Sequence, residues 1–210
     1  MRVMGIDPGS RRTGWGVVER VAGRPRLVAA GAIATNPKDP MPQRLRVLHE
    51  GLRDLLAAHR PDAVAIEEIF AHRSAASAIV LGQARGVALA VVALADVPLH
   101  GYNAMVVKRT VAGSGSADKA AMQRMVALLL GEEVAGPADA ADAVAIAITH
   151  QTHAAARPSG AGGGVAEGGT PSAPGRSPHD AIAAALAARG ATLPRPLPGA
   201  ARAGRTRGWR

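Results

Sequence analysis

The chain has 210 residues, of which 48% are apolar, carries a formal net charge of +9 and contains no cysteine. Its length and apolar content suffice for one folded domain with its own core, and the lack of cysteine excludes disulfides, thiol catalysis and cysteine-ligated zinc. The positive charge favours an anionic partner, either nucleic acid or an anionic membrane surface, without deciding between them.

The pattern of apolar residues predicts a mixed α/β domain in which three strands come first. Short links between these three strands predict an antiparallel meander, with a turn at Gly23, Arg24 and Pro25. The expected strands are Arg2–Asp7, Gly14–Arg20, Arg26–Thr35, Asp62–Ile69 and Val97–Gly101. The expected helices are Met41–Arg60, Ser74–Asp96, Ala104–Val111, Ala117–Leu130 and Pro137–Ala155.

The composition changes sharply after Ala156, which predicts a domain at 1–156 and a tail at 157–210. The tail is rich in Gly, Pro, Ser, Ala and Arg, so we expect it to be disordered. Residues 1–150 hold 17 Lys/Arg and 14 Asp/Glu, a net +3, whereas residues 151–210 hold 8 Arg and 2 acids, a net +6. The tail is a candidate for salt-sensitive DNA affinity, and a biased genome composition is the alternative explanation.

The N-terminus and the longest apolar stretch bear on location. The first residues, MRVMGIDPG, become polar too soon for a signal peptide. The apolar stretch from Val87 to Val97 is interrupted by Asp96 and is too short to span a bilayer. We therefore expect a soluble, cytoplasmic protein with no membrane partner.

Acidic residues occur where they are costly. Asp7 ends the first strand, Glu67 and Glu68 lie inside the fourth, and Asp139 and Asp142 directly precede an apolar helical run. An ionised carboxylate beside an apolar core is unfavourable unless it is paired with or bound to a cation. Three segments of this kind suggest that the acids converge on one site.

The spacing of the acids is consistent with such a site. Glu67 and Glu68 point to opposite faces of a strand, so only one can face it. Asp139 and Asp142 fall on one face of the first helical turn. Carboxylates without cysteine or clustered histidine favour Mg²⁺ or Mn²⁺, commonly as two ions about 3.5–4 Å apart. Taken singly, Asp7 is also explained as a turn residue, and Asp139 and Asp142 as partners of a helix dipole.

Five segments together resemble the RuvC family of crossover junction endodeoxyribonucleases. They are GIDPGSRRTGWGVV (5–18), AIEEIF (65–70), LGQARGVA (81–88), VKRTVAGSGSADK (107–119) and DAADAVAIAITH (139–150). The resemblance covers residues 2–153 and implies a homodimer with an RNase H-like fold, a mixed five-stranded sheet flanked by helices. It also implies Mg²⁺-dependent resolution of four-way (Holliday) junction DNA in recombination and repair. Paired symmetric nicks would leave a 5′-phosphate and a 3′-hydroxyl, and a RuvA–RuvB branch-migration complex is an expected partner by analogy.

The resemblance further implies the residues of the site. The catalytic, metal-binding carboxylates are Asp7, Glu67, Asp139 and Asp142, which would hold two Mg²⁺ ions, with Mn²⁺ able to substitute. The glutamate that follows the first of the pair falls where the family varies, so it is left out of the site.

The resemblance implies contacts with DNA for Phe70, Lys108 and Lys119, and the place of Arg73 at the start of the following helix adds it to the DNA-binding residues. Lys108 and Lys119 match family lysines that support catalysis, where they would offset charge building on the scissile phosphate. Phe70 matches a ring expected to stack on bases near the junction, and Arg73 is a candidate for phosphate contact. Without the resemblance, solvated lysines and a core phenylalanine are the ordinary explanations.

Other residues keep two interpretations. Small residues along the helix at Ser74–Asp96 allow close helix approach, which the resemblance suggests is the twofold dimer contact. The alternative is a helix buried within one subunit. Ser116 either helps a loop to approach phosphate or caps the next helix. The roles of Glu68, Arg85 and His150 stay open.

Two other function classes fit part of the sequence. A phosphotransferase of the actin-like or sugar-kinase class also opens with a strand and an Asp-x-Gly turn, but it needs a second such domain and a longer chain. A junction-binding module without catalysis would rely on the basic tail. Acids at all four matched positions argue against it, because carboxylates without metal repel phosphate.

Overall fold

Three consecutive strands form an antiparallel meander in a five-stranded sheet. β1 (Arg2–Asp7) pairs with β2 (Arg12–Val21), and β2 pairs with β3 (Arg24–Ala34). β4 (Ala63–Glu67) joins β1 in parallel and β5 (Leu99–Tyr102) joins β4 in parallel, which gives the order β3-β2-β1-β4-β5. The structure is a computed structural model that describes residues 1–9, 11–68, 75–156 and 187.

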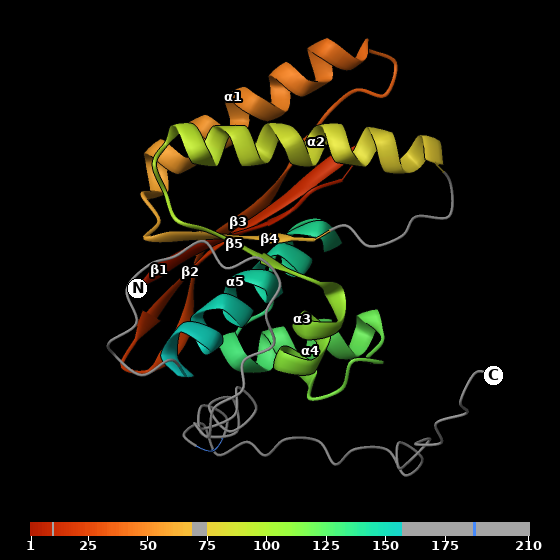
Figure 1. Cartoon of the computed structure of the whole chain (residues 1–210). Coiled ribbons are helices and arrows are strands. Elements are labelled where there is room, and N and C mark those ends of the chain that lie inside the picture. Colours follow the sequence, from red (N-terminus) through yellow and green to blue (C-terminus); the bar gives the residue numbers. More distant parts are fainter. Residues whose placement is uncertain (10, 69–74, 157–186, 188–210) are drawn as a thin grey trace, which may run out of the picture.

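Helices cover both faces of the sheet (Figure 1). One face carries α1 (Met41–His59) and α2 (Ala75–Leu94), and the other carries α3 (Ala104–Ala112), α4 (Lys119–Leu130) and α5 (Ala138–Ala156). Alternate residues of a strand enter the two cores: Met4 packs on the α1–α2 side and Val3 on the α5 side. The predicted mixed α/β fold is confirmed.

The turn between β2 and β3 differs from its prediction. Ala22 and Gly23 both have positive φ, 48° and 79°, as in a two-residue hairpin turn whose twist matches that of the strands. Arg24 and Pro25, which were expected in the turn, instead begin β3 and pair with Val21 and Arg20. The prediction was wrong because charged residues at exposed strand ends do not show the apolar alternation of a strand.

Other element ends shift by at most two residues. β4 ends at Glu67 instead of Ile69, a residue that lies outside those described. α4 begins at Lys119 because the side chain of Asp118 caps it, accepting a hydrogen bond from the backbone N of Ala121. Ser116 is therefore not the N-cap; its hydroxyl bonds that of Ser114 at 2.9 Å.

Glycines let α5 lie directly on β1 and β2. A side chain at Gly5 would collide with the carbonyl of Ala143, and one at Gly14 would collide with the carbonyl of Asp139. From Ala140 to Thr152, all residues of α5 except Asp142 are buried. This close packing holds the first turns of α5 beside the end of β1.

α2 is slightly shorter than the predicted Ser74–Asp96 and is largely exposed. Its 20 residues have a mean hydropathy of 1.8 over the most apolar window, of which 22% is buried. Among the described residues it is the one helix long and apolar enough, by length and composition, to cross a bilayer. Core helices of soluble proteins meet the same criterion, so the expectation of no membrane partner stays a prediction. Its buried residues, Ala84, Ala88, Val91 and Val92, pack in the core against α1 and the sheet.

Candidate active site

Three aspartates that are far apart in the sequence meet at the C-terminal end of the central strand β1. Asp7 is the last residue of β1, Asp139 lies in the first turn of α5, and Asp142 lies one turn later. One carboxylate oxygen from each of the three lies within 4.8 Å of the others. Residues three apart share a face of a helix, so α5 presents both of its aspartates to Asp7.

Glu67 joins this cluster from the neighbouring strand. β4 runs parallel to β1, with Ile66 paired to Ile6, so Glu67 ends β4 beside Asp7, and the two side chains share a hydrogen bond. Glu68 lies elsewhere: its carboxylate packs over Gly101 of β5. One glutamate of the pair faces the site, as strand alternation requires.

Crowding of the acids changes the protonation of Asp7. Burial, the hydrogen bond with Glu67 and the negative charges of Glu67, Asp142 and Asp139 raise the pKa of Asp7 from 3.8 to about 8. A bound divalent cation would replace that proton and compensate the clustered charge. All donors are carboxylate oxygens, the hard ligands that Mg²⁺ prefers, so the residues present fit such an ion. Among the described residues, no other group of three His, Asp or Glu side chains comes together in this way.

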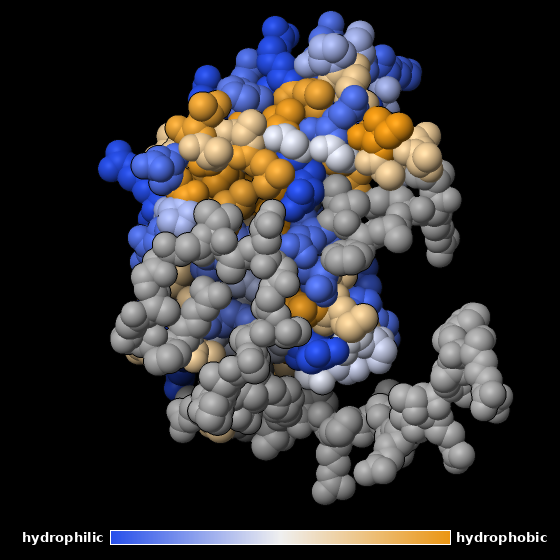
Figure 2. Space-filling model, viewed as in Figure 1, coloured by the Kyte–Doolittle hydropathy of each residue, from blue (hydrophilic) through white to orange (hydrophobic). Residues whose placement is uncertain are grey.

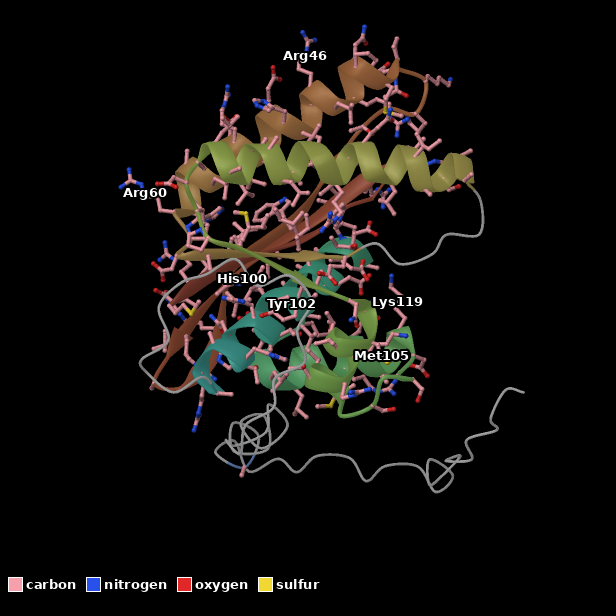
Figure 3. The ribbon with its side chains drawn as sticks, in the orientation of Figure 1. Arg46, Arg60, His100, Tyr102, Met105 and Lys119 are labelled. Atoms are coloured by element: carbon pink, nitrogen blue, oxygen red, sulfur yellow. The ribbon has the colours of Figure 1, made fainter. Side chains whose placement is uncertain are left out.

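Lys119 contacts the cluster from the start of α4. Its Nζ donates to Asp142 Oδ2 at 3.0 Å. This bond and the negative charges of the nearby aspartates raise the pKa of Lys119, whose side chain is labelled in Figure 3. The side chain is 57% exposed, so its ammonium group is accessible from solvent. Lys108 of α3 is half-buried, and its side chain makes no hydrogen bond or ion pair with any described residue. Phe70 and Arg73 lie outside the described residues.

Arg85 contacts the backbone of a residue in the site. It is the single charged residue of α2, and its Nε donates to the carbonyl of Glu67 at 3.3 Å. The bond ties α2 to the end of the strand that carries Glu67. The sequence left this role open, although a lone arginine in an otherwise uncharged helix was the available signal.

His150 lies away from the acids. It is buried, stacks on His100 at 4.2 Å between ring centroids, and its Nδ1 is 2.9 Å from the hydroxyl of Tyr102. It follows Asp139 by eleven positions in the helix, which is about 16 Å along the axis. Its contacts fasten α5 to β5.

The mixed sheet and its four clustered carboxylates define an RNase H-like nuclease, a class that hydrolyses phosphodiesters with carboxylate-bound metal ions. The profile of the family described as Crossover junction endodeoxyribonuclease RuvC matches residues 3–150. The chain belongs to this RuvC family. Membership overturns the phosphotransferase alternative.

Individual relatives agree with this result. The RuvC protein of Granulibacter bethesdensis is 47% identical over 165 residues, which are 79% of this chain and 93% of the relative. That of Chloroflexus aurantiacus is 49% identical over 151 residues, 71% of this chain and 92% of the relative. Thermus thermophilus RuvC in complex with a Holliday junction substrate is 39% identical with a TM-score of 0.69, covering 73% of this chain and 94% of that one.

Proposed function

We propose that this chain resolves Holliday junctions in DNA recombination and repair by paired symmetric nicks. The observation that carries the proposal is the meeting of the Asp7, Asp139 and Asp142 oxygens within 4.8 Å, with Glu67 bonded to Asp7. Family membership and the junction complex of the Thermus relative support the choice of substrate.

The four acids are proposed to hold two Mg²⁺ ions, with Mn²⁺ able to substitute. When bound, the ions supply a nucleophilic water and stabilise the charge on the leaving oxygen. Asp7 would release its proton to solvent when cations bind, because their positive charge would stabilise the ionised carboxylate against the neighbouring acids. Lys119 sits beside Asp142, where its charge opposes the negative charge that develops on the scissile phosphate. The proposed products carry a 5′-phosphate and a 3′-hydroxyl.

The remaining DNA contacts are proposed from the family resemblance. Lys108 is assigned to phosphate contact and catalytic support, Phe70 to stacking on bases, and Arg73 to phosphate contact. We also propose a nuclease domain at 1–156, a tail at 157–210 that adds DNA affinity, and a cytoplasmic location alongside a RuvA–RuvB motor.

A homodimer through α2 completes the proposal. Ile79 and Leu94 on this helix are 63% and 82% exposed, and side chains at Gly82 and Gly86 would meet nothing within 4 Å. Exposed apolar or small residues recur every three or four positions, at 75, 79, 82, 86, 90 and 93. Figure 2 shows apolar residues gathered over the part of this face where α2 lies. Twofold pairing of this surface would present two acid sites to two of the four strands of a junction.

The test is cleavage of a synthetic four-way junction in Mg²⁺ without ATP. The full chain should nick two strands of like polarity, and a linear duplex of the same sequence should stay intact. Asp7→Asn should lower the cleavage rate by roughly a thousandfold or more while junction affinity remains. Normal cleavage by Asp7→Asn would show that the cluster is not the catalytic site, and no cleavage by the natural chain would overturn the function itself.

A further inference from the structure

Arg12 lies on the same face of the sheet as the acids, two residues along β2 from the partner of Asp7. Asp7 pairs with Gly14 across β1 and β2, and directly paired residues share a face. This is the face that α5 covers, because a side chain at Gly14 would collide with Asp139. Residues two apart in a strand point the same way, so Arg12 also points to this face, about 7 Å along β2 from Gly14.

Arg11 and Arg12 together form a basic corner at the start of β2, beside the loop that follows Asp7. Both residues are exposed, and neither guanidinium makes an ion pair within the part of the chain that the structure describes. The carbonyl of Arg11 accepts a hydrogen bond from the backbone N of Thr35 at 2.9 Å. Gly9, in the loop after Asp7, packs against the carbonyl of Arg12. The backbone that carries the two guanidinium groups is therefore held beside the loop that follows Asp7.

The other end of the same hairpin is electrostatically different. Arg26 donates to Glu19 at 3.0 Å, and Arg2 lies 3.6 Å from the same carboxylate. An acid thus compensates basic residues at that end, whereas the corner beside the catalytic acids presents its positive charge to solvent.

We infer that Arg12, assisted by Arg11, binds a backbone phosphate of the junction arm that adjoins the cut. A DNA strand whose phosphate lies in the acid cluster must continue beyond the cluster on both sides. The basic corner of Arg11 and Arg12 supplies positive charge on one of these sides. The acids repel DNA, so cations on the same face are needed to hold the backbone in register. This inference rests on the proposed function and names the surface that holds the arm next to the active site.

The experiment measures junction affinity against salt concentration. A labelled four-way junction is titrated with the full-length chain carrying Asp7→Asn, in Mg²⁺, and binding is followed by fluorescence anisotropy. Each lost phosphate contact should lower the log–log salt slope by about 0.9. The proposed homodimer carries two copies of Arg12, so the loss of this contact in both subunits should lower the slope by about 1.8. Arg12→Gln should show this loss, and Arg12→Lys should retain the slope.

The matched control is Arg26→Gln, the same change at the opposite end of the same hairpin. Its slope should equal that of the parent. The inference is overturned if Arg12→Gln keeps the parent slope, or if Arg26→Gln loses as much. Because Arg12 is exposed, circular dichroism should show that both variants fold alike. If the natural chain binds junctions through Arg12 but never nicks them, the proposed function is contradicted and the inference about Arg12 still holds.

Discussion

Asp7 should make the metal-free protein less stable as the pH rises, and Asp7→Asn should remove this dependence. The pKa of Asp7 is about 8 in the folded protein and 3.8 as the ordinary value. Between these values the folded protein holds a proton that the unfolded chain has released. The contribution of Asp7 to the free energy of unfolding is therefore fully present below pH 3.8 and is lost as the pH rises toward 8.

The size of the effect follows from the width of the window. One titrating group changes the free energy of unfolding by at most about 1.4 kcal/mol per pH unit. Raising the pH from about 5.5 to about 7.5 should then cost the metal-free protein up to about 3 kcal/mol. Asparagine has nearly the same shape and no charge, so the Asp7→Asn variant should lack this part of the slope.

Urea unfolding in EDTA, followed by circular dichroism at several pH values, measures the difference. All other titratable groups are the same in both proteins, so the difference between the two curves isolates Asp7. Adding Mg²⁺ at pH about 7.5 should stabilise the natural chain and release protons, with a much smaller effect on Asp7→Asn. Parallel stability curves for the two proteins in EDTA would refute the argument that crowding by Glu67, Asp139 and Asp142 raises the pKa of Asp7.

Three further predictions concern packing, assembly and the tail. Gly5→Ala should destabilise the fold by roughly 3 kcal/mol in urea unfolding, because the added methyl would overlap the Ala143 carbonyl; an unchanged midpoint would contradict the close packing of α5. Gly86→Glu should yield a monomer in analytical ultracentrifugation without loss of stability, since space is open around Gly86, whereas Ala58→Glu on exposed α1 should leave a dimer; a dimeric Gly86→Glu would exclude the α2 interface. A chain ending at Ala156 should bind junction DNA with a smaller salt slope than the full chain, and equal slopes would mean that the tail adds no phosphate contacts.

Local patterns in the sequence were sufficient for the order of the elements and for the residues worth testing. Apolar periodicity reports which face of an element is buried, so it predicted five strands and five helices with ends off by a few residues. Charge at positions next to apolar runs singled out Asp7, the pair Glu67 and Glu68, and the two aspartates of α5, because an acid beside an apolar core is unfavourable without a partner. The family resemblance then selected Glu67 from the pair. The motifs in their order identified the family.

Only the tertiary structure decided which groups meet. Asp7 and Asp142 are 135 positions apart, and no local pattern specifies that Gly5 and Gly14 let α5 approach until their oxygens share a site. The pairing of Lys119 with Asp142, the bond from Arg85 to the end of β4 and the place of Arg12 on the acid face arise in the same way. Periodicity describes the direction of a side chain relative to its own element, whereas these contacts depend on how separate elements pack against one another.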